Sequence, residues 1–289
     1  MTNIMKIVFL GNTKYSAIGE EIIHKKFPLS LVVTTTDRPS GRKRELKPTA
    51  TKQFANSKNI PVLETDNLDK KAVSQIAKIK PDFIIVEDYG LILPESLLEI
   101  PRYAPLNIHH SLLPKYRGPS PAPSTILNGE KISGVTIISM TELVDAGDIL
   151  AQVKYELKAA ETTDSLLTAL NKLGGELVLK VIEDFINGKE NPVEQNHKEA
   201  TITKRFTKQD GFVDLGNPLD RQTLDRMIRA YYPWPNVWSK VKVKSGKSII
   251  VKFLPEGKIQ PEGKKPMTIA QFKNGYPQVY EQISKLFAD

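Results

Sequence analysis

Three polar side chains in this sequence could together carry out acyl chemistry: an amide, an imidazole and a carboxylate. Asn107 and His109 are two residues apart at the end of an apolar run. On an extended backbone that spacing places both side chains on the same face. Asp145 comes 36 residues after His109, on a glycine-containing turn that follows another apolar run. These are the groups needed to move an acyl group onto an amine, so Asn107, His109 and Asp145 are the candidate catalytic residues.

The three groups would divide the work of acyl transfer. When an amine attacks an acyl carbonyl, negative charge develops on the carbonyl oxygen, and the Asn107 amide can donate a hydrogen bond to it. His109 is the candidate for proton transfer, and Asp145 would orient its ring and raise its pKa. The sequence contains no cysteine, which excludes a thiol nucleophile. Ser111 is an alternative nucleophile, but it lacks a G-x-S-x-G motif, and a hydroxyl in such a turn more often binds the backbone.

The elements expected around these residues alternate between strands and helices over the first 200 residues. This alternation predicts an α/β fold, a Rossmann-like and mostly parallel sheet, in which ligands bind beyond the carboxyl ends of the strands. Because Asn107 and Asp145 fall on or just after such ends, we expect them to lie close together. The predicted strands are residues 6–11, 29–36, 60–63, 83–86, 104–108, 134–140 and 149–157, and the predicted helices are residues 17–26, 51–58, 68–78, 94–99, 125–128 and 163–187.

The composition and hydrophobic periodicity of the sequence change near residue 188 and again near residue 204. Residues 189–203 are polar and without a convincing period, which is typical of a linker. Beyond them a helix over residues 221–231 precedes two strand-like runs, residues 237–243 and 248–254, that are separated by a Ser-Gly-Lys turn. We therefore predict a catalytic domain over residues 1–188 and a smaller, mainly β, barrel-like domain over residues 204–289.

Composition indicates an ordinary globular chain. It has 289 residues, 40% hydrophobic and 26% charged, and no apolar run approaches the roughly 20 residues of a membrane helix. The first strand begins without the layout of a signal peptide, and the absence of cysteine fits a reducing compartment. We expect a cytoplasmic monomer that does not contact a membrane.

The net charge of +8 is unevenly distributed. From Lys204 to the end there are 16 Lys and Arg residues against 8 Asp and Glu, so this third carries the whole excess. A second basic cluster lies between Arg38 and Lys52, with only Glu45 to offset it. Localised positive charge favours a polyanion such as nucleic acid, and the alternative is a solvated surface.

Several stretches resemble one family of enzymes. Residues 107–118 resemble the N-I-H-x-S-L-L-P-x-x-R-G signature of the formyltransferases that use 10-formyltetrahydrofolate, and residues 144–148 and 89–94 resemble two further blocks of that family. These blocks also fit enzymes that formylate glycinamide ribonucleotide or amino sugars. Four narrower stretches resemble the methionyl-tRNA formyltransferases: residues 37–48, 207–211, 228–235 and 261–267. In all, the resemblance extends from about residue 5 to about residue 276.

The resemblance implies transfer of a formyl group from 10-formyltetrahydrofolate to the amino group of initiator methionyl-tRNA, with no metal. It implies that Leu91, Ser111, Leu112, Leu113, Pro114 and Asp148 bind the folate, although Leu112 and Leu113 would equally suit the core. It also implies tRNA contacts in the basic loop and at the start of the second domain: Arg38, Arg42, Lys43, Arg44, Lys204, Arg205 and Lys208.

The sequence also departs from the family pattern near the site. His110 stands where the family usually has Pro or Gly, and Glu87 and Asp88 replace small residues. Two other functions stay open beside the leading one. A sugar-nucleotide N-formyltransferase would share the catalytic blocks but not the basic loop and basic third, and a catalytically idle RNA-binding protein would not need Asn107 or His109.

Overall fold

The computed structural model describes residues 5–40, 45–243 and 246–286. The contacts between residues divide the chain into two compact units. The first comprises Met1–Pro121, Ile132–Glu156 and Leu167–Thr203, and the second comprises Ala122–Lys131, Leu157–Leu166 and Lys204–Asp289. The division at residues 188 and 204 that we expect from composition stays a prediction.

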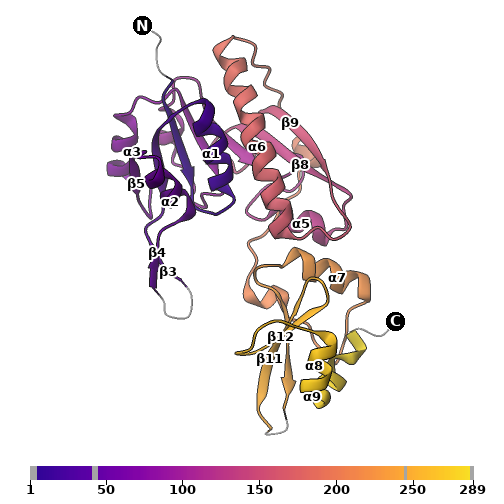
Figure 1. Ribbon diagram of the computed structural model, residues 1–289. Helices are drawn as coiled ribbons and strands as arrows, with labels where there is room; N and C mark the ends of the chain where they lie inside the picture. Colours follow the sequence, from indigo (N-terminus) through magenta and orange to yellow (C-terminus); the bar gives the residue numbers. More distant parts are fainter. Residues whose placement is uncertain (1–4, 41–44, 244–245, 287–289) are drawn as a thin grey trace. The chain divides into compact units, whose positions relative to one another are not determined.

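A seven-stranded sheet forms the centre of the first unit, in the order β5-β2-β1-β6-β7-β8-β9 (Figure 1). The strands from β5 to β7 run parallel, which confirms the mostly parallel α/β fold, whereas β8 and β9 pair antiparallel. The strands are β1 (Ile7–Gly11), β2 (Leu29–Thr34), β5 (Val62–Glu64), β6 (Phe83–Glu87), β7 (Ala104–His109), β8 (Ile132–Ser139) and β9 (Ile149–Glu156).

Burial explains why the central strands are continuous apolar runs. Every residue of β1 and of β6 is buried, as expected for parallel strands with both faces covered. The edge strand β9 instead alternates between half-buried and exposed residues along its second half. The helices are α1 (Ser16–Lys26), α2 (Ala50–Ser57), α3 (Lys70–Ala77), α4 (Glu95–Leu98), α5 (Pro121–Leu127) and α6 (Thr163–Ile186).

A two-stranded ribbon projects from the first unit (Figure 1). It consists of β3 (Arg38–Ser40) paired antiparallel with β4 (Glu45–Lys47). The ribbon carries the basic stretch that the sequence associates with nucleic acid, and Arg42, Lys43 and Arg44 lie outside the described residues.

The second unit has its own antiparallel sheet, in the order β10-β11-β12-β13, as the sequence predicts for the C-terminal third. Its core includes Val237, Val251, Phe253, Ile259 and Phe272. Two short C-terminal helices were not predicted, although a Thr-x-x-Gln capping box marks the start of the first. In the described part of the chain no helix has the length and apolar character to cross a membrane. The elements are α7 (Arg221–Ala230), β10 (Val237–Lys242), β11 (Ser248–Leu254), β12 (Lys258–Pro261), β13 (Met267–Thr268), α8 (Ile269–Gly275) and α9 (Pro277–Ile283).

Helix α6 packs closely against the sheet and against α1 because a glycine lies at each of these contacts. A Cβ atom at Gly174 would lie 2.4 Å from Cγ2 of Ile108, which sits between Asn107 and His109 on β7. A Cβ atom at Gly175 would lie 3.1 Å from the Cα atom of Gly19 on α1. The helix is continuous through both glycines. Gly174 therefore permits close packing against the strand that carries the candidate site, and Gly175 permits close packing against α1.

Replacing Gly174 with Ala should therefore destabilise the first unit. The added methyl group has no free space next to the buried Ile108, and such overpacking typically costs about 1–3 kcal/mol. Chemical denaturation of Gly174→Ala measures the loss in free energy of unfolding. Lys172→Ala, at an exposed position of the same helix, is the control and should change that free energy little. Equal stability of the two variants would contradict the packing argument.

Candidate active site

Strand β7 presents the amide and the imidazole on one face, as the two-residue spacing predicts. Leu106 and Ile108 point to the other face and are buried in the core. Asn107 pairs with Val86 of β6 and with Ile138 of β8, so both neighbouring strands fix its position in the sheet. The side chain of Asn107 is half-buried, and that of His109 is 5% exposed. The ends of the strands therefore hold both groups rigidly.

The carboxylate of Asp145 meets both of these side chains. Nδ2 of Asn107 donates a hydrogen bond to Oδ1 of Asp145 over 3.1 Å. Oδ2 of Asp145 accepts a hydrogen bond of 2.7 Å from the backbone N–H of Gly118 and lies 3.5 Å from Nδ1 of His109. The structure thus brings together the three residues that the sequence proposes as catalytic.

The route by which Asp145 reaches the site differs from the expected one. We expected the carboxyl ends of parallel strands to meet at one edge, but β8 is antiparallel to β7, and its last residue, Ser139, pairs with Leu106. The loop over residues 140–148 therefore folds back along the sheet to place Asp145 beside Asn107. Asp145 has a left-handed backbone with φ of 50°, and a Cβ atom at Gly147 would lie 1.8 Å from the carbonyl oxygen of Ser139.

Gln195 holds this folded-back loop, and sequence reasoning missed it. Its Nε2 donates to the carbonyl oxygens of Asp145, over 2.9 Å, and Gly147, over 2.7 Å. Its Oε1 accepts hydrogen bonds from Nε and Nη2 of Arg117. Gln195 is 3% exposed although it lies in the stretch interpreted as a linker. A lone glutamine in a polar segment gives no signal of this kind, because its three partners are distant in sequence.

The electrostatic environment of His109 favours its neutral form. Burial lowers the pKa of His109, and this effect outweighs the attraction of Asp145 and the hydrogen bond with the Tyr116 carbonyl, both of which raise it. Nε2 of His109 lies 2.9 Å from that carbonyl oxygen. The expectation that Asp145 raises the pKa was right for its own contribution and wrong for the net shift. A neutral imidazole can accept a proton at neutral pH.

The loop after β7 is pinned by polar contacts from the neighbouring strands. Oγ1 of Thr136 accepts from the N–H of Leu113 and donates to the carbonyl oxygen of Ser111, while Nε2 of Gln152 donates to the carbonyl oxygen of Leu113. The Ser111 hydroxyl is 1% exposed and donates to the carbonyl oxygen of Lys115 over 2.7 Å. Ser111 thus binds the backbone, as expected for a hydroxyl in this turn, which argues against a serine nucleophile.

The residues predicted to bind folate differ in their exposure. Ser111 and Leu113 are buried, and the side chain of Leu112 lies against Gly134 of β8. Asp148 is exposed and contributes its carbonyl oxygen to the N–H of Ser139. The remaining two, Leu91 and Pro114, are half-buried. Their contact with folate stays a prediction.

The described residues predicted to contact tRNA are all exposed. Arg38 pairs with Asp66 over 3.1 Å. Lys204 pairs with Asp210, and Nζ of Lys208 lies 5.4 Å from the centre of the Trp238 ring. Arg205 lies between Lys204 and Lys208 in the sequence, and the role of all these residues stays a prediction.

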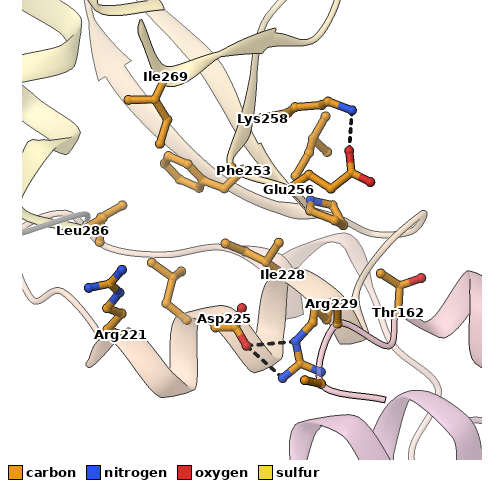
Figure 2. Close-up of a pocket in the computed structure, with 16 residues that line it drawn as sticks. Thr162, Arg221, Asp225, Ile228, Arg229, Phe253, Glu256, Lys258, Ile269 and Leu286 are labelled. Carbon is orange, nitrogen blue, oxygen red and sulfur yellow. Dashed lines mark hydrogen bonds and ion pairs between the residues drawn. The ribbon is translucent and has the colours of Figure 1, made fainter. Parts of the chain in front are cut away.

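The second unit contains a cavity of about 610 Å³ (Figure 2). Apolar side chains line most of it, among them Leu224, Ile228 and Phe253, and its charged groups are paired, Arg229 with Asp225 and Lys258 with Glu256. No predicted catalytic or folate-binding residue lines it. The described residues also contain no cluster of three or more His, Asp and Glu side chains arranged to hold a metal ion.

Comparison with known proteins agrees with the fold. The family model described as "Formyl transferase" matches residues 5–182. A 4-N formyltransferase from Francisella tularensis has a similar structure, with a TM-score of 0.65 and 22% identity over 88% of this chain and 98% of that one. HypX from Aquifex aeolicus, solved in complex with tetrahydrofolic acid, has a TM-score of 0.62 and 18% identity over 94% of this chain and 47% of that one. The family match over more than half of the chain shows that it is a formyltransferase.

Relatives with higher sequence identity show to which kind of formyltransferase the chain is similar. The methionyl-tRNA formyltransferase of Geobacillus sp. strain WCH70 is 34% identical, and the match covers 94% of this chain and 95% of the relative. The enzyme of the same name from Methylacidiphilum infernorum is 37% identical over 86% of this chain and 78% of the relative. The chain belongs to the methionyl-tRNA formyltransferase family.

Gln195 offers a test of how the site is held together. Gln195→Ala should lower turnover by tenfold or more, because the Asp145 loop loses the two hydrogen bonds that Gln195 donates to its backbone. Small displacements of catalytic groups can cost about 100-fold. Steady-state formyl transfer and the melting temperature should be measured together. Gln53→Ala, at an exposed position of α2, is the matched control. Normal turnover by a folded Gln195→Ala would show that the loop does not need this residue.

Proposed function

We propose that this chain transfers the formyl group of 10-formyltetrahydrofolate to the amino group of initiator methionyl-tRNA, at the site formed by Asn107, His109 and Asp145. The observation that carries the proposal is the single carboxylate that contacts both the amide and the imidazole. The relatives that share up to 38% identity with the chain are named methionyl-tRNA formyltransferase, which supports the acceptor. A structural neighbour was solved with tetrahydrofolic acid, which supports the donor.

Asn107 acts on the carbonyl oxygen of the transferred group. Its Nδ2 atom carries two N–H groups, and one of them donates to Asp145. That bond fixes the plane of the amide, so the second N–H can be directed at the formyl oxygen, where negative charge develops as the amine attacks. Because the donor is oriented before the reaction, it stabilises this charge without reorganisation.

His109 moves the proton. Its neutral ring accepts the proton that the attacking amine must lose, and it returns a proton to the folate nitrogen that leaves. To accept this proton at Nε2, the neutral ring carries its own hydrogen on Nδ1, which faces Asp145. Nε2 then leaves the carbonyl oxygen of Tyr116, to which it donates when the ring carries the hydrogen on Nε2, and takes the amine as its partner. Asp145 faces Nδ1 and stabilises the imidazolium while it carries the extra proton. The residues require no covalent intermediate with the enzyme.

The basic residues position the tRNA. Lys and Arg side chains bind phosphates, which sets the orientation of a nucleic acid without reading its bases. Arg38 of the β3–β4 ribbon and Arg42, Lys43 and Arg44 beside it would contact the acceptor end, and Lys204, Arg205 and Lys208 would add further phosphate contacts. We further propose that the protein acts as a cytoplasmic monomer without contact to a membrane.

The second candidate is sugar-nucleotide N-formylation. It is favoured by structural neighbours described as sugar N-formyltransferases, such as the one from Shewanella sp. at 16% identity. Identities this low support the fold alone. The basic third of the chain and the basic ribbon give the tRNA acceptor the advantage.

A direct assay distinguishes the two acceptors. Purified protein is incubated with 10-formyltetrahydrofolate and either charged initiator tRNA or amino-sugar nucleotides, and the mass of the product is measured. We expect formyl-methionyl-tRNA. Formylation of a sugar nucleotide alone would overturn the proposed acceptor, and no product from either acceptor would favour an RNA-binding protein without catalysis.

Loss of either polar partner at the centre of the site should abolish turnover. For His109→Ala and Asp145→Ala we expect a fall of about 10²–10⁴ in the turnover number, because proton transfer or its orientation is lost. Binding of methionyl-tRNA, measured by filter retention, should stay within twofold of the unaltered protein. His24→Ala on α1 is the histidine control. Near-normal turnover by either site variant would refute the assigned role.

The basic ribbon should matter for tRNA and not for folate. Arg42→Ala should weaken tRNA binding, and if Arg42 contacts one phosphate, the slope of log affinity against log salt should fall by about one. Folate affinity, measured by fluorescence titration, should be unchanged. Lys71→Ala, at an exposed position of α3, is the control for loss of one surface charge. Reduced folate binding with normal tRNA binding would contradict the assignment.

A further inference from the structure

Three residues that depart from the family pattern lie together behind the site. His110 is 3% exposed, and its Nε2 lies 3.5 Å from Oε1 of Glu87, while its Nδ1 lies 3.4 Å from Oδ1 of Asp88. Glu87 ends β6 and is fully buried, and Asp88 follows it with a left-handed backbone, φ 49°. An imidazole clamped between two carboxylates thus occupies a place where the family usually has small residues.

The surrounding elements are shaped around this cluster. A Cβ atom at Gly19 of α1 would lie 2.0 Å from Oε2 of Glu87, so the glycine leaves the space that the carboxylate fills. A Cβ atom at Gly174 of α6 would lie 3.5 Å from Oε1 of the same carboxylate. Oγ1 of Thr13 donates to Oδ2 of Asp88 over 3.2 Å. The cluster is therefore an integrated part of the packing and not a surface accident.

The ionised groups of the cluster are one cation and one anion. Burial alone would lower the pKa of His110, but Asp88 and Glu87 raise it to about 10. Burial would raise the pKa of Asp88, but His110 holds it below its ordinary value. Burial raises the pKa of Glu87 to about 8, and burial together with Glu87 raises that of Glu20 on α1 to about 9. At neutral pH His110 is thus charged, Asp88 is ionised, and both glutamates are protonated.

His110 directly follows His109, so this charge lies next to the base of the proposed reaction. The titratable groups around His109 are Asp145 at 3.5 Å and Asp88, which favour its protonated form, and His110, which opposes protonation. Beyond His110 lie Glu87 and, from α1, Glu20. We propose that His110, clamped between Asp88 and Glu87, is a positioning residue for His109 that fixes the end of β7 and keeps the neighbouring ring unprotonated.

The effect of His110 on the pH dependence of formyl transfer rests on the proposed function. The titration of His109, which tests the inference, does not. If His109 must be neutral to accept a proton, the rate falls as the pH drops through the pKa of His109. The imidazolium of His110 opposes a second positive charge beside it, so it extends the active range to lower pH. Removing that charge raises the pKa of His109, and the acidic side of the pH–rate profile then moves to higher pH.

The decisive variant is His110→Gln, with His24→Gln as the matched control. The titration of His109 is followed by NMR of the protein with labelled histidine and no substrates, since the chain contains only four histidines. We expect the midpoint for His109 to rise by about half a pH unit or more in His110→Gln and to stay unchanged in His24→Gln. The acidic side of the kcat/KM profile should move by the same amount. A purely structural role would lower the rate at every pH without moving the midpoint.

A second variant keeps the test informative if His110→Gln does not fold. The triple variant Glu87→Ala, Asp88→Ala, His110→Gly removes the whole cluster and approaches the small residues of the family. It deletes the cation together with its anion, and the midpoint should still rise, because His110 opposes protonation of His109 more strongly than Asp88 favours it. An unchanged or lower midpoint for His109 in the folded variants overturns the proposal. A raised midpoint in a protein that formylates no acceptor would leave the coupling intact and refute the proposed function instead.

Discussion

The site depends on the partners of one partly buried carboxylate. An ionised carboxylate away from water is expensive unless hydrogen bonds satisfy it. Asp145 is satisfied by the amide of Asn107, the backbone N–H of Gly118 and the facing imidazole of His109. The strand, the loop after it and the folded-back loop are therefore joined through two oxygen atoms. The chemistry and the local stability share the same contacts, so a group that orients the catalyst also holds the loops in place.

The antiparallel pairing of β8 with β7 explains why the loop that carries Asp145 needs Gln195 to hold it in place. A strand that leaves the sheet beside Leu106 cannot place its next residues at the other end of β7 without reversing direction. Gln195 fixes that reversal by binding two carbonyl oxygens of the loop, and it binds Arg117 at the same time. One buried amide therefore couples the loop of Asp145 to the loop that follows His109.

The sequence predicts the parts of the site that depend on local periodicity and not those that depend on tertiary contacts. The two-residue spacing of Asn107 and His109 fixes their common face because side chains alternate along any strand. The meeting with Asp145 was expected for the wrong reason, since strand direction cannot be read from an apolar run. Gln195 was interpreted as part of a linker, and the helices α8 and α9 were missed although a capping box announces the first. The mostly parallel sheet was predictable because strands alternate with helices over the first 200 residues.

The buried cluster shows why departures from a family pattern must be considered jointly. Asp88 alone would be a partly buried carboxylate without its cationic partner, and breaking a buried ion pair in this way costs about 3–5 kcal/mol. His110 alone would be driven to its neutral form by burial. Together His110 and Asp88 balance each other, and Glu87 and Glu20 retain their protons. The replacements are therefore acceptable as a set and unfavourable singly, so a charged group beside the base can only exist with the partners that the structure places around it.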